Sequence, residues 1–95
     1  MARYELEISE RAKWELQTLR SYDRRPIVEA IRALSHQAET MTRNRRPLRE
    51  ALEGLPMPAW QLRVGTHRVF YEIRTPATVR ILRVIIKEGT TAESL

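Results

Sequence analysis

The sequence predicts an α+β domain of two layers, in which a helical hairpin covers one face of a four-stranded, mainly antiparallel sheet. Three observations lead to this prediction. Residues 59–73 alternate apolar and polar side chains on either side of Gly65-Thr66, which is typical of a half-buried antiparallel hairpin. Two earlier stretches repeat apolar residues at helical spacing, and two such helices can cover one sheet face. Ninety-five residues suffice for one small core, so we expect a single domain over residues 1–95.

The first strand and the first helix are expected at the N-terminal end. Residues 4–8 alternate and predict a strand, and Ser9 can cap the helix that follows. Apolar residues at positions 12, 16 and 19 form one stripe of that helix. Trp14 lies off the stripe, near the opposite side of the helix. Because another protein often covers an exposed Trp, we expect Trp14 to contact a partner or a second copy of the chain. The alternative is that Trp14 lies flat on its own domain.

The remaining elements follow from breaks in the pattern. Residues 21–23 are expected to interrupt the helices, with Pro26 at the first position of the second one. Apolar residues up to Met41 face the core in this reading. The proline-containing segment 43–58 is expected to be a loop, and residues 78–86 a last strand after the hairpin. The predicted order is therefore β-α-α-β-β-β.

The alternation also predicts which side chains lie on the sheet face that the helices leave open. Burying Arg83 would be costly, so we assign its side of the last strand to the open face. That face then carries Gln61, Arg63, Arg68, Phe70, Arg83 and Lys87. The opposite set, expected to face the helices, is Trp60, Leu62, Val64, Val69, Tyr71, Ile73, Leu82 and Val84.

Composition favours an anionic partner and excludes several kinds of site. The net charge is +5, the isoelectric point is about 10.4, and 15 of the basic residues are Arg. A basic domain suggests nucleic acid or an acidic protein as partner, and Arg45 and Arg46 belong to a basic run that could contact RNA. The absence of Cys excludes disulfides, and the two His are not at metal-ligand spacing, so we expect neither metal nor cofactor. With neither a signal sequence nor a bilayer-length apolar run, we expect a cytoplasmic protein without membrane contact.

The open face suggests chemistry on phosphates. Arg63, Arg68, Arg83 and Lys87 can hold phosphates and stabilise negative charge in a transition state, and Phe70 offers a ring on which a base can stack. His67 is either a general acid or base or a turn residue without chemistry. A solvated polar face is the alternative for the whole set, because an exposed sheet needs one.

Two stretches of the chain resemble a known family. Residues 60–65 (Trp-Gln-Leu-Arg-Val-Gly) and 67–73 (His-Arg-Val-Phe-Tyr-Glu-Ile) are similar to the signature of the RelE/ParE superfamily of bacterial type II toxins. Residues 42–48 and 84–88 further resemble a RelE-like subgroup.

The resemblance implies a small toxin that a cognate antitoxin holds inactive. RelE-type members cleave mRNA on the ribosome, which would make this chain an endoribonuclease. The alternative is a ParE-like inhibitor of DNA gyrase, or an inactive relative that only binds its antitoxin. By position, Arg63 and Arg68 match basic residues of the RNase site, and Lys87 keeps a positive charge there. Gln61 replaces a Lys, and the family's C-terminal Tyr or His has no counterpart, so His67 is the remaining candidate for proton transfer.

Overall fold

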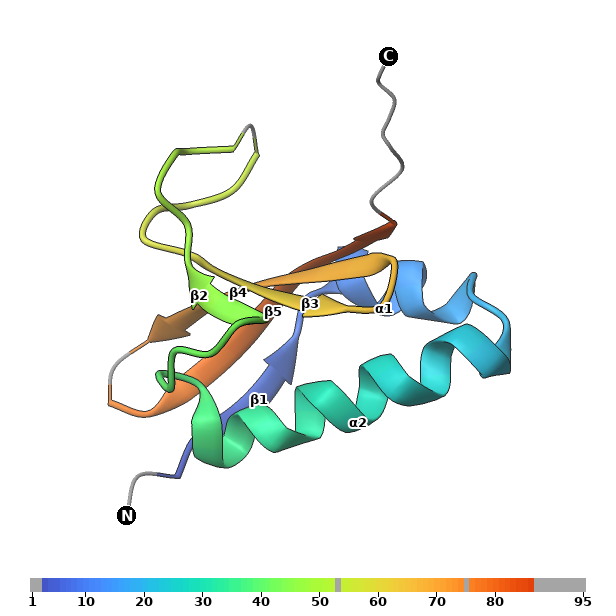
Figure 1. Cartoon of the computed structure of the whole chain (residues 1–95), viewed down its shortest axis with the longest axis horizontal. Coiled ribbons are helices and arrows are strands. Elements are labelled where there is room, and N and C mark those ends of the chain that lie inside the picture. Colours follow the sequence, from blue (N-terminus) through green and yellow to red (C-terminus); the bar gives the residue numbers. More distant parts are fainter. Residues whose placement is uncertain (1–2, 53, 75, 87–95) are drawn as a thin grey trace.

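The computed structural model of the chain describes residues 3–52, 54–74 and 76–86. It confirms the α+β class, with two helices and one five-stranded sheet (Figure 1). The strands lie in the order β1-β5-β4-β3-β2, with β1 parallel to β5 and the other neighbours antiparallel. The elements in chain order are β1 Glu5–Ile8, α1 Glu10–Gln17, α2 Ser21–Gln37, β2 Arg45–Pro47, β3 Trp60–Val64, β4 His67–Arg74 and β5 Thr78–Ile86.

The prediction of four strands is wrong, because β2 lies within the segment that was expected to be a loop. This three-residue strand pairs with β3 at the sheet edge. The backbone bonds continue on both sides, since Arg63 N donates to Asn44 O at 2.7 Å and Leu48 N donates to Ala59 O at 2.8 Å. Pro47 lacks an N–H, which an edge strand tolerates. A strand this short shows no alternation of its own, so only its pairing with β3 reveals it.

The second helix starts earlier than predicted. Ser9 caps α1 as expected, with its Oγ accepting a bond from Ala12 N at 3.1 Å. However, α2 already begins at Ser21, and Pro26 lies inside it. The missing N–H of Pro26 would have bonded to the carbonyl of Tyr22, a residue that is 84% exposed and that water can reach. The helix ends at Gln37, so Met41 is exposed and does not face the core.

The helices line one side of the sheet and form the core with it. α1 packs against β5, and α2 packs against β1 and β3. Figure 1 shows α2 along one side of the sheet, while residues 48–52 and 54–59 lie away from it on the other side. Neither helix is long and apolar enough to cross a membrane. The buried core joins Leu16, Ile27, Ile31 and Leu34 of the helices to Leu62, Val69, Tyr71, Val79, Ile81 and Val84 of the sheet.

The predicted orientation of β3 and β4 is confirmed, but that of β5 holds only in part. Phe70 pairs with Arg83, whereas the next residue, Tyr71, pairs with Ile81. Leu82 is therefore an extra residue in β5, a bulge that changes the phase of the alternation. Val84 faces the helices as predicted, but the prediction for Leu82 is wrong, because Val79 and Ile81 take the core positions before the bulge.

Candidate phosphate-binding face

Three arginines gather on the sheet face opposite the helices; we call Arg46, Arg63 and Arg68 the arginine cluster. Arg63 of β3 lies directly opposite Arg68 of β4, and Arg46 of β2 lies opposite Gln61, two residues before Arg63. Cross-strand partners and residues two apart on a strand share a face, so all three side chains project from the same side. Within the described residues, none of the three forms an ion pair with a carboxylate.

The cluster concentrates positive charge at a cost to stability. Like charges directly opposite each other on neighbouring strands are destabilising. Burial, and then the charges of Arg63 and Arg46, lower the pKa of the Arg68 guanidinium. Arg68 stays charged at neutral pH, since an arginine titrates far above it. An anion placed between these side chains would relieve the repulsion, and phosphate matches the fork of the guanidinium group.

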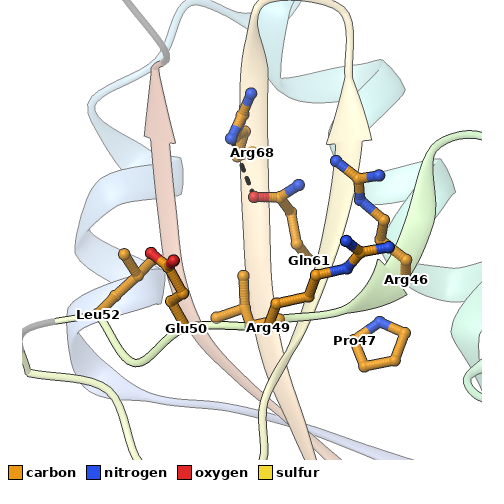
Figure 2. A pocket seen from close by; sticks show the side chains of 8 residues that line it. Arg46, Pro47, Arg49, Glu50, Leu52, Gln61 and Arg68 are labelled. Carbon is orange, nitrogen blue, oxygen red and sulfur yellow. Dashed lines mark hydrogen bonds between the residues drawn. The ribbon is translucent and has the colours of Figure 1, made fainter.

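Gln61 holds the Arg68 side chain in position through a hydrogen bond. It is 7% exposed, and its Oε1 accepts a hydrogen bond from Arg68 Nη1 at 3.0 Å (Figure 2). The Arg68 Nε is buried and has no partner in the described part of the chain. The position was predicted to lie on the open face, but its role as a holder of Arg68 was not. Residue type alone gave no signal for that role.

A hollow of about 400 Å³ adjoins Arg68 and Gln61, and we call it the 46–52 hollow. The chain that follows β2 forms its wall. Figure 2 shows Arg46 and Arg49 on one side of it, and the carboxylate of Glu50 beside Leu52 on the other. Its lining residues are Arg46, Pro47, Leu48, Arg49, Glu50, Leu52, Gln61 and Arg68.

The side chain of His67 does not join the arginine cluster, although a hollow of about 290 Å³ at the turn is lined by Arg63, Gly65, Thr66, His67 and Arg68. It shares the parity of Val69, so its side chain points to the helix side of the sheet, away from Arg68. It is 7% exposed and lies 3.5 Å from the Thr66 hydroxyl through Nδ1. Another hollow, of about 330 Å³, places it beside Tyr22 and Pro26 at the start of α2. This position fits the turn-residue alternative better than acid–base chemistry shared with the cluster.

Two arginines predicted to contact RNA also have partners within the protein. The Nη2 of Arg83 lies 2.6 Å from Glu15 Oε2, and Glu15 Oε1 also accepts a bond from Val84 N at 2.7 Å. β1 pairs only with Thr78–Ile81, so Glu15 closes the edge of β5 that β1 leaves open. Arg45 is buried and donates to Thr40 O at 3.1 Å and to Gln37 Oε1 at 3.0 Å, which ties β2 to the end of α2.

Three predicted site residues remain, namely Phe70, Lys87 and Trp14. Phe70 is 3% exposed, so it offers no open ring for a base to stack on. Lys87 lies outside the described residues. Trp14 is 59% exposed, as its place off the helical stripe predicts. The described residues include no group of His, Cys, Asp and Glu that could hold a metal ion.

The chemical capacity of this face is electrostatic. Three guanidinium groups on one sheet face can bind phosphates and stabilise added negative charge on them. Among the described residues that line the 46–52 hollow or form the arginine cluster, Glu50 is the one that carries a carboxylate. The face can therefore hold and polarise a phosphate, while the side chain of the neighbouring His67 points to the helix side of the sheet.

Comparison with known proteins identifies the family of this chain. The profile of the family described as ParE toxin of type II toxin-antitoxin system, parDE, matches residues 6–88. A chain of the toxin–antitoxin complex RelBE2 from Mycobacterium tuberculosis is 30% identical, with 90% of this chain and 99% of that chain covered and a TM-score of 0.71. No curated protein sequence gives a significant match.

Two more distant structures share the fold. A chain of the archaeal RelE–RelB complex from Pyrococcus horikoshii is 21% identical, with a TM-score of 0.74 and coverage of 95% of this chain and 100% of that one. The isolated Escherichia coli RelE toxin is 20% identical, with a TM-score of 0.67 and coverage of 92% and 87%. The chain therefore belongs to the RelE/ParE superfamily and is a toxin of a type II toxin–antitoxin system.

Proposed function

We propose that this toxin acts on RNA, holds the RNA backbone on the arginine cluster and cleaves mRNA on the ribosome. The observation that carries the proposal is the juxtaposition of Arg46, Arg63 and Arg68 without a carboxylate partner in the described chain. Unpaired arginines on one face are the usual means of binding nucleic-acid phosphates. A face selected for stability alone would interleave carboxylates with these arginines.

The cleavage would proceed by attack of a ribose 2′-hydroxyl on the neighbouring phosphorus. The new P–O bond forms as the bond to the 5′-oxygen breaks, which leaves a 2′,3′-cyclic phosphate and a 5′-hydroxyl. Negative charge grows on the phosphoryl oxygens in between, and Arg68, held by Gln61, is placed to stabilise it. The 2′-hydroxyl loses its proton to water or to a ribosomal group, and the 5′-oxygen gains one from the same surroundings. Since His67 lies on the other face, cleavage depends on positioning and electrostatics.

A second candidate function is inhibition of DNA gyrase without RNA cleavage. Two observations favour it: the matching family profile is that of the ParE toxins, and the side chain of His67 points to the sheet face opposite the arginine cluster. In this case the cationic face would contact an acidic surface or DNA and would carry out no covalent step.

A cognate antitoxin is the partner implied by the relatives, whose structures include complexes with RelB. We propose that Trp14 on α1 contacts this antitoxin or a second copy of the toxin. The side chain is 59% exposed, and large exposed aromatic residues are enriched at protein interfaces.

The two functions separate in parallel assays of one preparation. Purified toxin is added to translating ribosomes, where primer extension maps cuts in the mRNA, and to a gyrase supercoiling reaction. We expect ribosome-dependent cuts that Arg68→Ala reduces by about 10²-fold or more, the range for losing one transition-state donor. Arg32→Ala, which removes an exposed arginine from α2, should cleave like wild type. Gyrase inhibition together with no cleavage would establish the second candidate instead.

A further inference from the structure

The 46–52 hollow has more room and a different chemistry than a phosphate needs. Its volume of about 400 Å³ falls within the range of about 300–1,000 Å³ that small-ligand sites occupy. Pro47, Leu48 and Leu52 give it apolar walls. A phosphate on the arginine cluster would touch only the cationic side, so these walls are left for another part of the ligand.

The polar groups of the hollow are separated by charge. Arg46 and Arg49 lie on one side of it, and the Glu50 carboxylate lies on the other beside Leu52 (Figure 2). Glu50 forms no ion pair within the described residues. The cationic side suits a phosphate, and a carboxylate next to apolar walls suits a flat, partly apolar group with hydrogen-bond donors.

Gln61 adds an amide group to the lining of this space. Gln61 is more than nine-tenths buried, and its Oε1 accepts the hydrogen bond from Arg68. Its amide N–H groups form no hydrogen bond within the described chain. The amide nitrogen of Gln61 can therefore donate to an acceptor of a bound ligand. It lines the hollow between the arginines and the apolar walls, where a nucleotide's sugar or base would present acceptors.

From these features we infer that the 46–52 hollow holds one nucleobase of the bound RNA and prefers a base with an exocyclic amino group over uracil. This inference rests on the proposed function, because the strand that delivers the base has its phosphate on the arginine cluster. Adenine, cytosine and guanine each offer an amino group to the Glu50 carboxylate. Uracil offers carbonyl oxygens at the corresponding edge, and these repel a carboxylate.

The test is a titration of the purified toxin with single nucleotides, followed by NMR or calorimetry. The probes are the 3′- and 5′-monophosphates of adenosine, cytidine and uridine, with ribose 5-phosphate as the probe without a base. We expect the adenosine and cytidine nucleotides to bind about three- to tenfold more tightly than the uridine nucleotides, which is the effect of about one hydrogen bond. Glu50→Gln should remove this preference, since an amide both donates and accepts. Glu29→Gln, which changes an exposed carboxylate on α2, should keep it.

Two further variants distinguish a failure of the proposed base site from a failure of the proposed RNA-binding function. Leu52→Ala should lower the affinity of every nucleotide toward that of ribose 5-phosphate. Arg68→Ala should lower the affinity of all probes, including ribose 5-phosphate. Equal binding of uridine and adenosine nucleotides by wild type, or a preference that survives Glu50→Gln, would overturn the base site while phosphate binding stands. If ribose 5-phosphate fails to bind, or binds to Arg68→Ala as to wild type, the proposed function fails and the base site fails with it.

Discussion

Replacing Glu15 by Ala should destabilise the protein strongly, although the residue lies on the short helix α1. The residue is 8% exposed, and its carboxylate accepts a bond from Val84 N at 2.7 Å and from Arg83 at 2.6 Å. It therefore closes the backbone edge of β5 and neutralises a half-buried guanidinium at once. A third contact, with Arg11 at 3.4 Å, adds little because Arg11 is 63% exposed.

The magnitude follows from these contacts. An unpaired buried N–H at Val84 costs about 1–3 kcal/mol. Losing the pair with Arg83 adds up to about 1 kcal/mol, because that side chain is 28% exposed and water can solvate it. Glu15→Ala should thus lower the free energy of unfolding by about 1–4 kcal/mol. Glu15→Gln keeps an acceptor for Val84 N and should lose less than half as much.

Urea unfolding followed by Trp fluorescence measures these differences. Glu29→Ala is the matched control, since it removes an exposed carboxylate from α2 and should change the free energy by no more than about 0.5 kcal/mol. A loss below about 1 kcal/mol for Glu15→Ala, or an equal loss for Glu15→Gln, would refute the reasoning that Glu15 closes the β5 edge through a backbone bond.

Three further predictions concern the core, the alkaline limit and the partner. Leu62→Ala should cost about 2–5 kcal/mol in urea unfolding, because Leu62 is 4% exposed, whereas exposed Leu52→Ala should cost less than about 1 kcal/mol. Burial raises the pKa of Tyr71 above its ordinary value of about 10, so the unfolded chain releases this proton first as the pH rises. The free energy of unfolding should therefore be steady below about pH 10 and fall above it, and Tyr71→Phe should fall less steeply; an equal slope would contradict this. Trp14→Ala should leave unfolding unchanged and weaken antitoxin binding in calorimetry, and unchanged affinity would show that the antitoxin does not use Trp14.

Much of the sheet could be predicted because period-two alternation reports local geometry. Leu62, Val69 and Tyr71 face the helices as predicted, and Arg63 and Arg68 share the other face, because a tight turn after Val64 fixes the register of β3 against β4. Alternation cannot foresee a bulge, so the phase change at Leu82 was missed.

The missed features depend on contacts between distant parts of the chain. Glu15 and Arg83 are 68 residues apart, and nothing in the local sequence indicates that they pair. Arg45 was predicted to contact RNA from its charge, but its partners, Gln37 and Thr40, lie at the end of α2. β2 and the 46–52 hollow likewise exist only once the chain after α2 folds back along β3.

The sequence predicts which face of the sheet a side chain of the candidate site lies on. It does not predict whether that side chain is covered by other parts of the chain. Arg63 and Arg68 were found because the alternation of β3 and that of β4 each place the arginine on the face opposite the apolar residues, where the two pair across the strands. His67 precedes Arg68 directly and so points the other way, a consequence of the alternation that the prediction of His67 as a candidate acid or base did not use. Phe70 has the right parity, but its burial depends on what covers the sheet, and the sequence pattern does not contain that information.

The central claim is that the arginine cluster binds RNA phosphates, and the salt dependence of RNA binding tests it most directly. Affinity for a short single-stranded RNA is measured by fluorescence anisotropy at several salt concentrations for wild type, Arg68→Ala, the triple variant of Arg46, Arg63 and Arg68, and the control Arg32→Ala. Each lost phosphate contact should reduce the slope of log K against log salt by about 0.7. We expect a reduction of about 0.7 for Arg68→Ala, of about 2 for the triple variant and none for Arg32→Ala. Equal slopes for the triple variant and Arg32→Ala would contradict the claim.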